Sequence, residues 1–244
     1  MSNLPFDESK IIKLNPVTFI NGDNMEYLRW CKKNLMFKHF HIGIVDPPYG
    51  ISVGNMMLGA SSKGHKEKSY KTGDWDNEVP SQEYWDLLWY CCRELIVWGG
   101  NYFVSNFGQV KNDDKPTPIK DGRCFIVWDK MNDGMSFAPC ELALTTFDDR
   151  NAIMIRAARN KSTVDDKGQD RRHPTQKPVY LYDTIYTHFN KNGIRVLDTH
   201  GGSHTHAIAA FRNNVNLTII EREESYHKDG IEAYKEVWKK QRLF

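Results

Sequence analysis

The sequence lacks long apolar runs and a strong excess of charge of either sign. Its 33 Lys and Arg residues nearly balance its 31 Asp and Glu residues, which leaves a formal net charge of +2 at pH 7. No stretch approaches the ~20 apolar residues of a membrane-spanning helix, and the first residues do not follow the pattern of a secretory signal. We therefore expect a cytoplasmic protein with no membrane partner, in which any contact with a polyanion comes from local basic segments.

The chain also lacks the cysteine patterns of disulfide-rich and zinc-binding proteins. Its five cysteines are an odd number and include no Cys-x-x-Cys pair, so we expect reduced thiols. Three histidines, His200, His204 and His206, surround a Gly-Gly pair, but they would bind a metal only if all three converged on one ion. We predict instead that they line a pocket or cover the turn, and we predict no metal.

Segments with strand and helix patterns alternate along the chain. Strands are predicted at 16–21, 41–46, 95–98, 124–130, 141–147, 151–157, 194–198 and 216–221, and helices at 25–34, 81–94, from 178 onward, 205–213 and at the C-terminal end. This order predicts an α/β fold, a Rossmann-like doubly wound mixed sheet with helices on both faces. We expect one domain over 1–244, with polar loops inserted at about 51–80, 107–121 and 157–172.

A glycine turn near the C-terminal end follows an apolar strand that ends in Asp198. Gly201 and Gly202 let the backbone approach a ligand closely. Glu221 ends the next strand about 20 residues later, which is the spacing of an acidic residue that binds ribose hydroxyls. The pattern is weaker than Gly-x-Gly-x-x-Gly, because His204 stands where a third small residue is expected. The turn nevertheless predicts a cofactor site at the carboxyl edge of a sheet.

The stretch Asp46-Pro47-Pro48-Tyr49 follows another apolar strand. Two prolines with fixed φ hold a carboxylate, an exposed carbonyl and an aromatic ring in a rigid corner. The alternative is that Pro47-Pro48 only ends the strand. We expect this corner and the glycine turn to face each other across one edge of the sheet.

With these motifs, the chain resembles the amino-methyltransferases that act on DNA, specifically the adenine-N6 group. The resemblance covers nearly the whole chain, in the motif order of phage and prophage members. It rests on FINGDNMEYL before IGIVDPPYG, then VWGGNYF, FIVWDK, ELALTTF, HPTQKP and VLDTHGGSHTHAIAA. It implies the methyltransferase fold with permuted motif order, in which DPPY precedes the cofactor loop.

The resemblance also implies roles for residues. Asp46 and the carbonyl of Pro47 would accept hydrogen bonds from the adenine amine, within the rigid Pro47-Pro48 corner, and Tyr49 would stack on the base after it rotates out of the duplex. Methyl transfer from S-adenosylmethionine (SAM) would be a direct in-line displacement. The residues matched to the donor site are Asp198, Gly201, Gly202, Ser203 and Glu221, with Thr175 and Lys177 beside its methionine end.

The expected partner is DNA, held by basic clusters in the three inserted loops. A homodimer and a cognate restriction nuclease are further partners to consider. The usual donor loop reads DPFxGSGTT, whereas Thr199, His200 and His204 here replace the Pro, the Phe and the second Gly. His204 matters most, because its side chain occupies a position usually kept bare.

Several alternatives stay open at this stage. Cytosine-N4 methylation needs the same geometry, but such relatives usually carry Ser in place of Asp46. Cytosine-C5 methylation would use a cysteine such as Cys140, which we expect instead to be a small buried hydrophobe. A catalytically silent nucleic-acid-binding relative would have lost the donor through His204. The tryptophans Trp85, Trp89 and Trp98 are expected in the core rather than stacked on bases.

Overall fold

The computed structural model describes residues 4–50, 79–107, 109, 124–132, 138–156, 176–189 and 193–241. Their strands are β1 (Ile11–Leu14), β2 (Val17–Asn21), β3 (Phe40–Val45), β4 (Cys92–Trp98), β5 (Phe125–Asp129), β6 (Cys140–Thr145), β7 (Ile153–Arg156), β8 (Arg195–Asp198) and β9 (Asn216–Glu221). All belong to one sheet with the order β1-β2-β9-β8-β3-β4-β6-β5-β7. The three predicted inserted loops lie almost entirely outside the described residues, as does Thr175.

The middle of the sheet is parallel and its margins are mixed. Strands β2, β9, β8, β3 and β4 run parallel, whereas β1 and β6 pair antiparallel at either side. Beyond β6, strand β5 pairs antiparallel with it and β7 pairs parallel with β5. The parallel strands are mostly buried, as expected for a sheet covered on both faces. The predicted doubly wound mixed sheet is confirmed.

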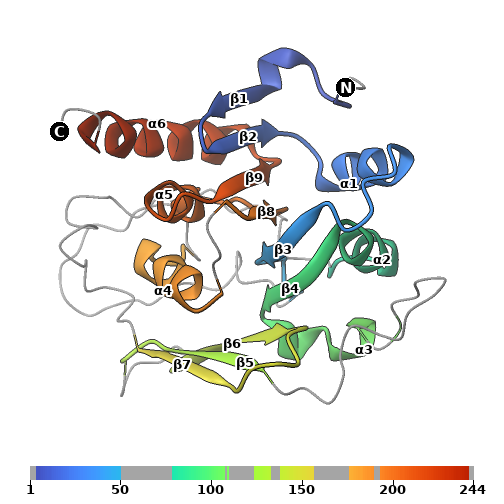
Figure 1. Cartoon of the computed structure of the whole chain (residues 1–244), viewed down its shortest axis with the longest axis vertical. Helices are drawn as coiled ribbons and strands as arrows, with labels where there is room; N and C mark the ends of the chain where they lie inside the picture. The colour runs from blue at the N-terminus through green and yellow to red at the C-terminus, as the bar shows by residue number, and fades with distance from the viewer. Residues whose placement is uncertain are drawn as a thin grey trace.

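Helices cover both faces of this sheet (Figure 1). The helices are α1 (Asn24–Lys33), α2 (Gln82–Cys91), α3 (Val104–Phe107), α4 (Val179–Phe189), α5 (Thr205–Arg212) and α6 (Glu224–Gln241), with short 3-10 turns at Glu8–Lys10 and Gly100–Tyr102. Helices α1 and α2 pack together on one face, and α5 packs between α4 and α6 on the other. Trp85 and Trp89 lie in the hydrophobic cluster that includes side chains of α1 and α2, and Trp98 lies in the cluster that includes side chains of α4 and α5. All three are buried, so their predicted core positions are confirmed.

The two largest boundary differences from the sequence prediction lie between α2 and β4. The helix predicted to reach Glu94 ends at Cys91, and β4 begins at Cys92 rather than at Leu95. The reason is tertiary, because Cys92 pairs with Phe40 at the start of β3, and this pairing extends the strand toward the helix. Strand β1 was not predicted; it is a short edge strand with one antiparallel neighbour and little burial.

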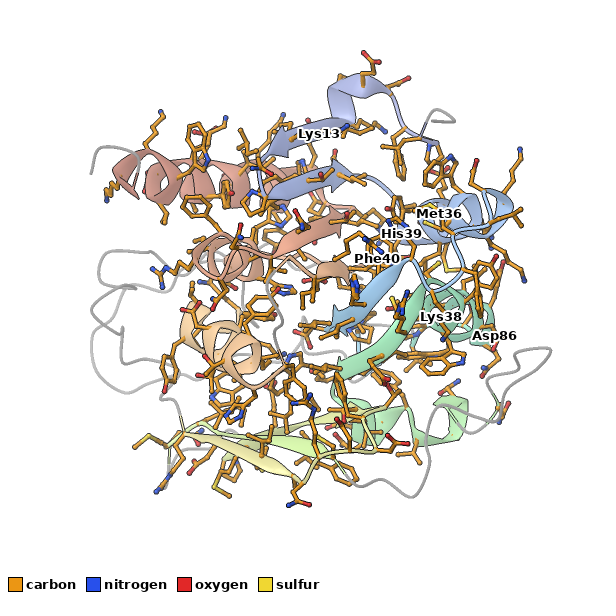
Figure 2. The ribbon with its side chains drawn as sticks, viewed as in Figure 1. Lys13, Met36, Lys38, His39, Phe40 and Asp86 are labelled. Atoms are coloured by element: carbon orange, nitrogen blue, oxygen red, sulfur yellow. The ribbon has the colours of Figure 1, made fainter. Side chains whose placement is uncertain are left out.

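The amino end of β3 is fixed against α2. Lys38 donates from Nζ to the carbonyls of Trp89 and Cys92, at 2.7 Å each, and the ammonium lies 3.3 Å from the Trp89 ring centroid. Figure 2 shows Lys38 beside α2, just before His39 and Phe40 lead into β3. A hollow of about 350 Å³ opens at this amino edge, lined in part by Lys13, His39, Phe40 and Arg195. It lies at the opposite end of the sheet from Asp46.

The described helices include none with both the length and the apolarity needed to cross a membrane.

Candidate active site

The carboxyl edge of the parallel strands gathers the predicted site residues. Gly43 of β3 pairs with Leu197 of β8, so Asp46, just beyond β3, and Asp198, at the end of β8, leave adjacent strands in the same direction. Glu221 ends β9 on the far side of β8. The proline corner and the glycine turn therefore lie at one edge of the sheet, where open α/β folds bind ligands.

The proline corner presents the Asp46 carboxylate with both oxygens engaged. Tyr49 donates its hydroxyl to Oδ1 at 2.7 Å, and Lys177 donates from Nζ to Oδ2 at 2.6 Å. Burial raises the pKa of Asp46, and the Lys177 ammonium opposes this rise. Pro47 is buried and Pro48 half-buried, which is consistent with a rigid corner.

The Tyr49 ring lies against a bare stretch of backbone. It stacks on Tyr102, with centroids 5.2 Å apart and planes at 19°, and meets the edge of Phe103. A Cβ on Gly99 would lie 2.3 Å from Cε1 of Tyr49, and Gly99 has φ of +62°, so both space and backbone conformation require glycine there. Tyr102 is 50% exposed. The motif VWGGNYF therefore supplies the floor and the outer neighbour of Tyr49.

Charged residues that the sequence reasoning left without a role complete the corner. Lys177 also lies 3.1 Å from Glu141 Oε2, and Glu141 Oε1 lies 2.7 Å from Lys130 Nζ. Burial disfavours the charged form of Glu141, but the two lysines lower its pKa to about 2. The available signal was positional: Lys130 directly follows β5 and Glu141 is the second residue of β6, so both lie where apolar strands meet this edge.

Lys177 has partners that the sequence did not predict. It was expected to offer a cation to the methionine end of the donor. In the structure two carboxylates, Asp46 and Glu141, already neutralise it, and they raise its pKa despite its burial. Lys177 therefore lies with Asp46 in the proline corner.

Asp198 organises the turn that follows β8. Its Oδ1 accepts from the backbone N–H of His200 at 2.9 Å, and its Oδ2 accepts from Nδ1 of His206 at 2.7 Å. Nε2 of His206 hydrogen-bonds the Tyr186 hydroxyl at 2.6 Å, and its ring stacks on Tyr182. This buried chain fixes the carboxylate and the start of α5 against α4.

The two glycines of the turn have different surroundings. A Cβ on Gly201 would lie 2.7 Å from the His204 ring and 2.9 Å from Ile219, so Gly201 is required for packing. A Cβ on Gly202 would meet nothing within 4 Å, although φ of +51° favours glycine there. Ser203 is buried beside them. The turn is thus tight underneath and open above Gly202.

Glu221 binds the backbone of this turn. Its Oε2 accepts from the Gly202 N–H and its Oε1 from the Glu223 N–H, at 2.7 Å each. Burial raises the Glu221 pKa to about 7, although both backbone hydrogen bonds oppose the rise. Each carboxylate oxygen keeps a second lone pair, so Glu221 can still accept hydrogen bonds from ligand hydroxyls.

His204 does not block the open side of the turn. It has φ of +57°, a conformation that costs most non-glycine residues energy. Its side chain is 0% exposed and lies beneath the turn, edge-on to Phe19 and 3.3 Å from the Nδ1 of His227. Burial lowers its pKa to about 3, so it is neutral. His204, which replaces the usual glycine, is thus accommodated in the buried core.

The three histidines of the motif have separate partners. His200 hydrogen-bonds Asn24 and Thr199, at 3.0 Å each, and burial lowers its pKa to about 4. His206 faces Asp198, whereas His204 points under the turn. The three rings therefore do not converge on a common point.

Cys140 corrects one expectation. It was expected to be buried, but it is exposed at the first position of β6, next to Pro139. The burial of β6 begins at Ala143, the first residue of the strand that pairs with both β4 and β5.

The comparisons with known proteins agree with this geometry. The family model described as DNA methylase, of N6/N4 type, matches residues 149–233, which include α4, β8, α5 and β9. This segment of the chain is therefore similar to DNA methylases. The match covers the glycine turn and Glu221, whereas Asp46 lies outside it.

Similar proteins match over most of the chain. Type II methyltransferase M2.DpnII of Streptococcus pneumoniae is 24% identical over 245 residues, which is 88% of each chain. The crystal structure of an M1.HpyAVI–SAM complex has a TM-score of 0.55 at 16% identity, covering 88% of this chain and 98% of that one. The cytosine-N4-specific PvuII DNA methyltransferase has a TM-score of 0.55 at 10% identity, covering 91% of each. These likenesses confirm the predicted methyltransferase fold.

Proposed function

We propose that this protein transfers a methyl group from SAM to the exocyclic N6 amine of adenine in DNA, by direct in-line displacement. The observation that carries the proposal is the placement of Asp46 and the open turn at Gly202 on adjacent parallel strands. The corner at Asp46 can hold an amine, and the turn at Gly202 can hold a nucleotide-like donor. The distance between them is set by the sheet.

The turn around Gly202, here called the donor corner, has chemistry that fits SAM. The open space above Gly202 admits a ligand that a side chain would exclude. The Glu221 carboxylate, held by two backbone N–H groups, is oriented to accept hydrogen bonds from ribose hydroxyls. Asp198 fixes the loop between them through the His200 N–H. When bound, SAM supplies an electrophilic methyl group on a sulfonium.

The acceptor corner fits an exocyclic amine. The lone pair of such an amine is delocalised into the base, so it becomes nucleophilic only when its N–H groups are held by acceptors. The Asp46 carboxylate and the Pro47 carbonyl are such acceptors in a rigid frame. Tyr49 orients Asp46 through its hydroxyl, and a base would stack on its ring in place of Tyr102, which is 50% exposed. No covalent enzyme intermediate is needed.

Adenine is preferred over cytosine N4 because Asp, rather than Ser, begins the motif at position 46. A base in a duplex must rotate out of the stack to reach this corner, so we include base flipping in the proposal. Homodimerisation and a partner nuclease stay predictions.

The test is a methylation assay on genomic DNA that lacks modification. Purified protein and SAM are incubated with the DNA, and nucleosides are separated by mass spectrometry. N6-methyldeoxyadenosine is expected, and long-read sequencing should place it in a recurring motif. N4-methyldeoxycytidine would reassign the substrate.

Donor binding is measured separately by thermal shift. SAM at a hundredfold excess over its Kd should stabilise the fold by about 2.7 kcal/mol. The absence of both methylation and stabilisation would favour the catalytically silent nucleic-acid-binding relative.

A further inference from the structure

Four charged side chains form a line of alternating sign behind the acceptor corner. Lys130 Nζ lies 2.7 Å from Glu141, Glu141 lies 3.1 Å from Lys177, and Lys177 lies 2.6 Å from Asp46. They come from four different segments of the chain: the ends of β5 and β3, the start of β6 and the residue two before α4. Two cations and two carboxylates therefore balance at one place.

We propose that Lys177 is a positioning residue for methyl transfer, which keeps Asp46 ionised and oriented toward the amine, and that Glu141 and Lys130 set the strength of its charge. This inference rests on the proposed function, because it assumes that Asp46 accepts the hydrogen bond of the target amine.

The need for a cation follows from the partial burial of Asp46, whose side chain is 22% exposed. Removal from water favours the protonated carboxyl, whose O–H would donate where the amine also donates. An ammonium at 2.6 Å favours the carboxylate instead. Tyr49 and Lys177 each use one lone pair, on different oxygens. Since a carboxylate has about four acceptor positions, room for the amine hydrogen bond is left on each oxygen.

The role of Glu141 follows from the burial of Lys177. Lys177 is 4% exposed. A buried cation with a single carboxylate partner would direct its whole charge at that carboxylate. Glu141 shares the ammonium and, as a second negative charge, raises the pKa of Asp46, whereas Lys177 lowers it. Lys130 holds Glu141 from the other side. Glu141 therefore weakens the effect of Lys177 on Asp46.

Aromatic faces support both cations. Lys177 Nζ lies 5.1 Å from the centroid of the Trp98 ring, and Lys130 Nζ lies 5.4 Å from that of Trp128. A cation over an aromatic face is attracted to it without a competing negative charge. Both tryptophans are buried, so the two ammonium groups lie against rings that are fixed in the core.

The experiment compares Lys177→Met with Glu141→Gln in the full-length protein. Without the Lys177 charge, the acid limb of the kcat pH profile should move up by about 1 to 3 pH units. Without the Glu141 charge, it should move down. Lys177→Arg keeps the charge and should return the limb toward its wild-type position. Lys235→Met, which breaks the exposed pair with Glu232 on α6, should leave the profile unchanged.

A second readout does not depend on activity. The 13C signal of the Asp46 carboxyl, identified by its loss in Asp46→Asn, is titrated in each variant. Its midpoint should rise in Lys177→Met and fall in Glu141→Gln. If Lys177→Met does not fold, Glu141→Gln and Lys177→Arg carry the test.

Shifts in the same direction for both variants, or an unchanged Asp46 titration, would overturn the inference and leave Lys177 a structural ion pair. The proposed function would still stand if the wild type methylates adenine and Asp46→Ala does not. Conversely, a wild type that methylates no base removes the proposed function, while the titration still reports on the charge line.

Discussion

His204 of the glycine turn packs directly against Gly230 of α6. A Cβ on Gly230 would lie 2.4 Å from Cδ2 of His204 and 2.8 Å from its Cβ. Glycine inside a helix costs about 1 kcal/mol relative to alanine, so its presence in α6 has a packing reason. The histidine that departs from the usual glycine of the turn is accommodated by a glycine elsewhere.

The pair predicts a change of sign in a double-mutant cycle. Gly230→Ala alone should destabilise the protein by about 1 to 3 kcal/mol, because it overpacks the His204 ring. In a His204→Gly background, the same change should instead be neutral or stabilising by up to about 1 kcal/mol, since only helix propensity remains. Urea unfolding of the four proteins measures this coupling. Equal effects in both backgrounds would mean that the two residues act independently.

The acceptor role of Asp46 predicts a selective loss of chemistry. Asp46→Ala should lower kcat by on the order of 100-fold or more, by analogy with the loss of a preorganised polar group from other active sites. SAM binding should be retained, because the donor corner lies on β8 and β9. Calorimetry with SAM, run beside the methylation assay, separates the two. Retained methylation would place the acceptor elsewhere.

Glu221 predicts a pH dependence of donor binding near neutrality. Its pKa is about 7 in the folded protein without ligand, and ribose hydroxyls donate to the ionised form. SAM affinity should therefore rise as the pH increases through 7, and Glu221→Gln should weaken binding and flatten this dependence. DNA binding should change far less. Equal loss of both would indicate misfolding.

Glu221 also affects the stability of the fold. Its contribution to stability should fall as the pH increases, whereas SAM affinity should rise. A carboxyl whose pKa is raised above its ordinary 4.5 holds its proton more tightly in the folded state. It therefore favours folding at acid pH, and this contribution declines as the pH rises from about 4.5 to about 7. Glu221→Gln should remove the decline in that window, as measured by urea unfolding at several pH values.

The two roles of Tyr49 can be separated by substitution. Tyr49→Phe keeps the ring on Gly99 and Tyr102 but removes the hydrogen bond to Asp46, so kcat should fall by roughly 10-fold. Tyr49→Ala also removes the stacking surface, and it should weaken binding of the flipped base. Fluorescence of 2-aminopurine at the target position reports the flipped base. Identical behaviour of the two variants would assign the whole effect to the hydroxyl.

Local patterns predicted the frame of the molecule, but not the contacts between distant segments. Apolar strand runs and caps such as Asp23, which accepts from Met25 and Glu26 at the start of α1, are readable in the sequence. The pairing of Lys177 with Asp46 joins positions 131 residues apart, and no local sequence pattern near either residue predicts it. The accommodation of His204 by Gly230 was hidden for the same reason.

The remaining misses have local causes. Strand β1 is short and lies at the edge, so it lacks a clear apolar pattern. Cys140 follows a proline at the rim of the sheet, where the first residues of β6 pair with β5 on one side but not with β4 on the other. In each case, position within the sheet decided burial.

The ladder between β3 and β8 also bears on motion. Adjacent strands lie about 4.8 Å apart and share backbone hydrogen bonds, so the two corners they carry are parts of one stiff body. Within the described part of the chain, no hinge separates the two corners, so the approach of methyl group and amine depends on how SAM and the DNA base bind. Turnover in such an enzyme should be governed by the arrival and departure of DNA rather than by a swing of the protein frame.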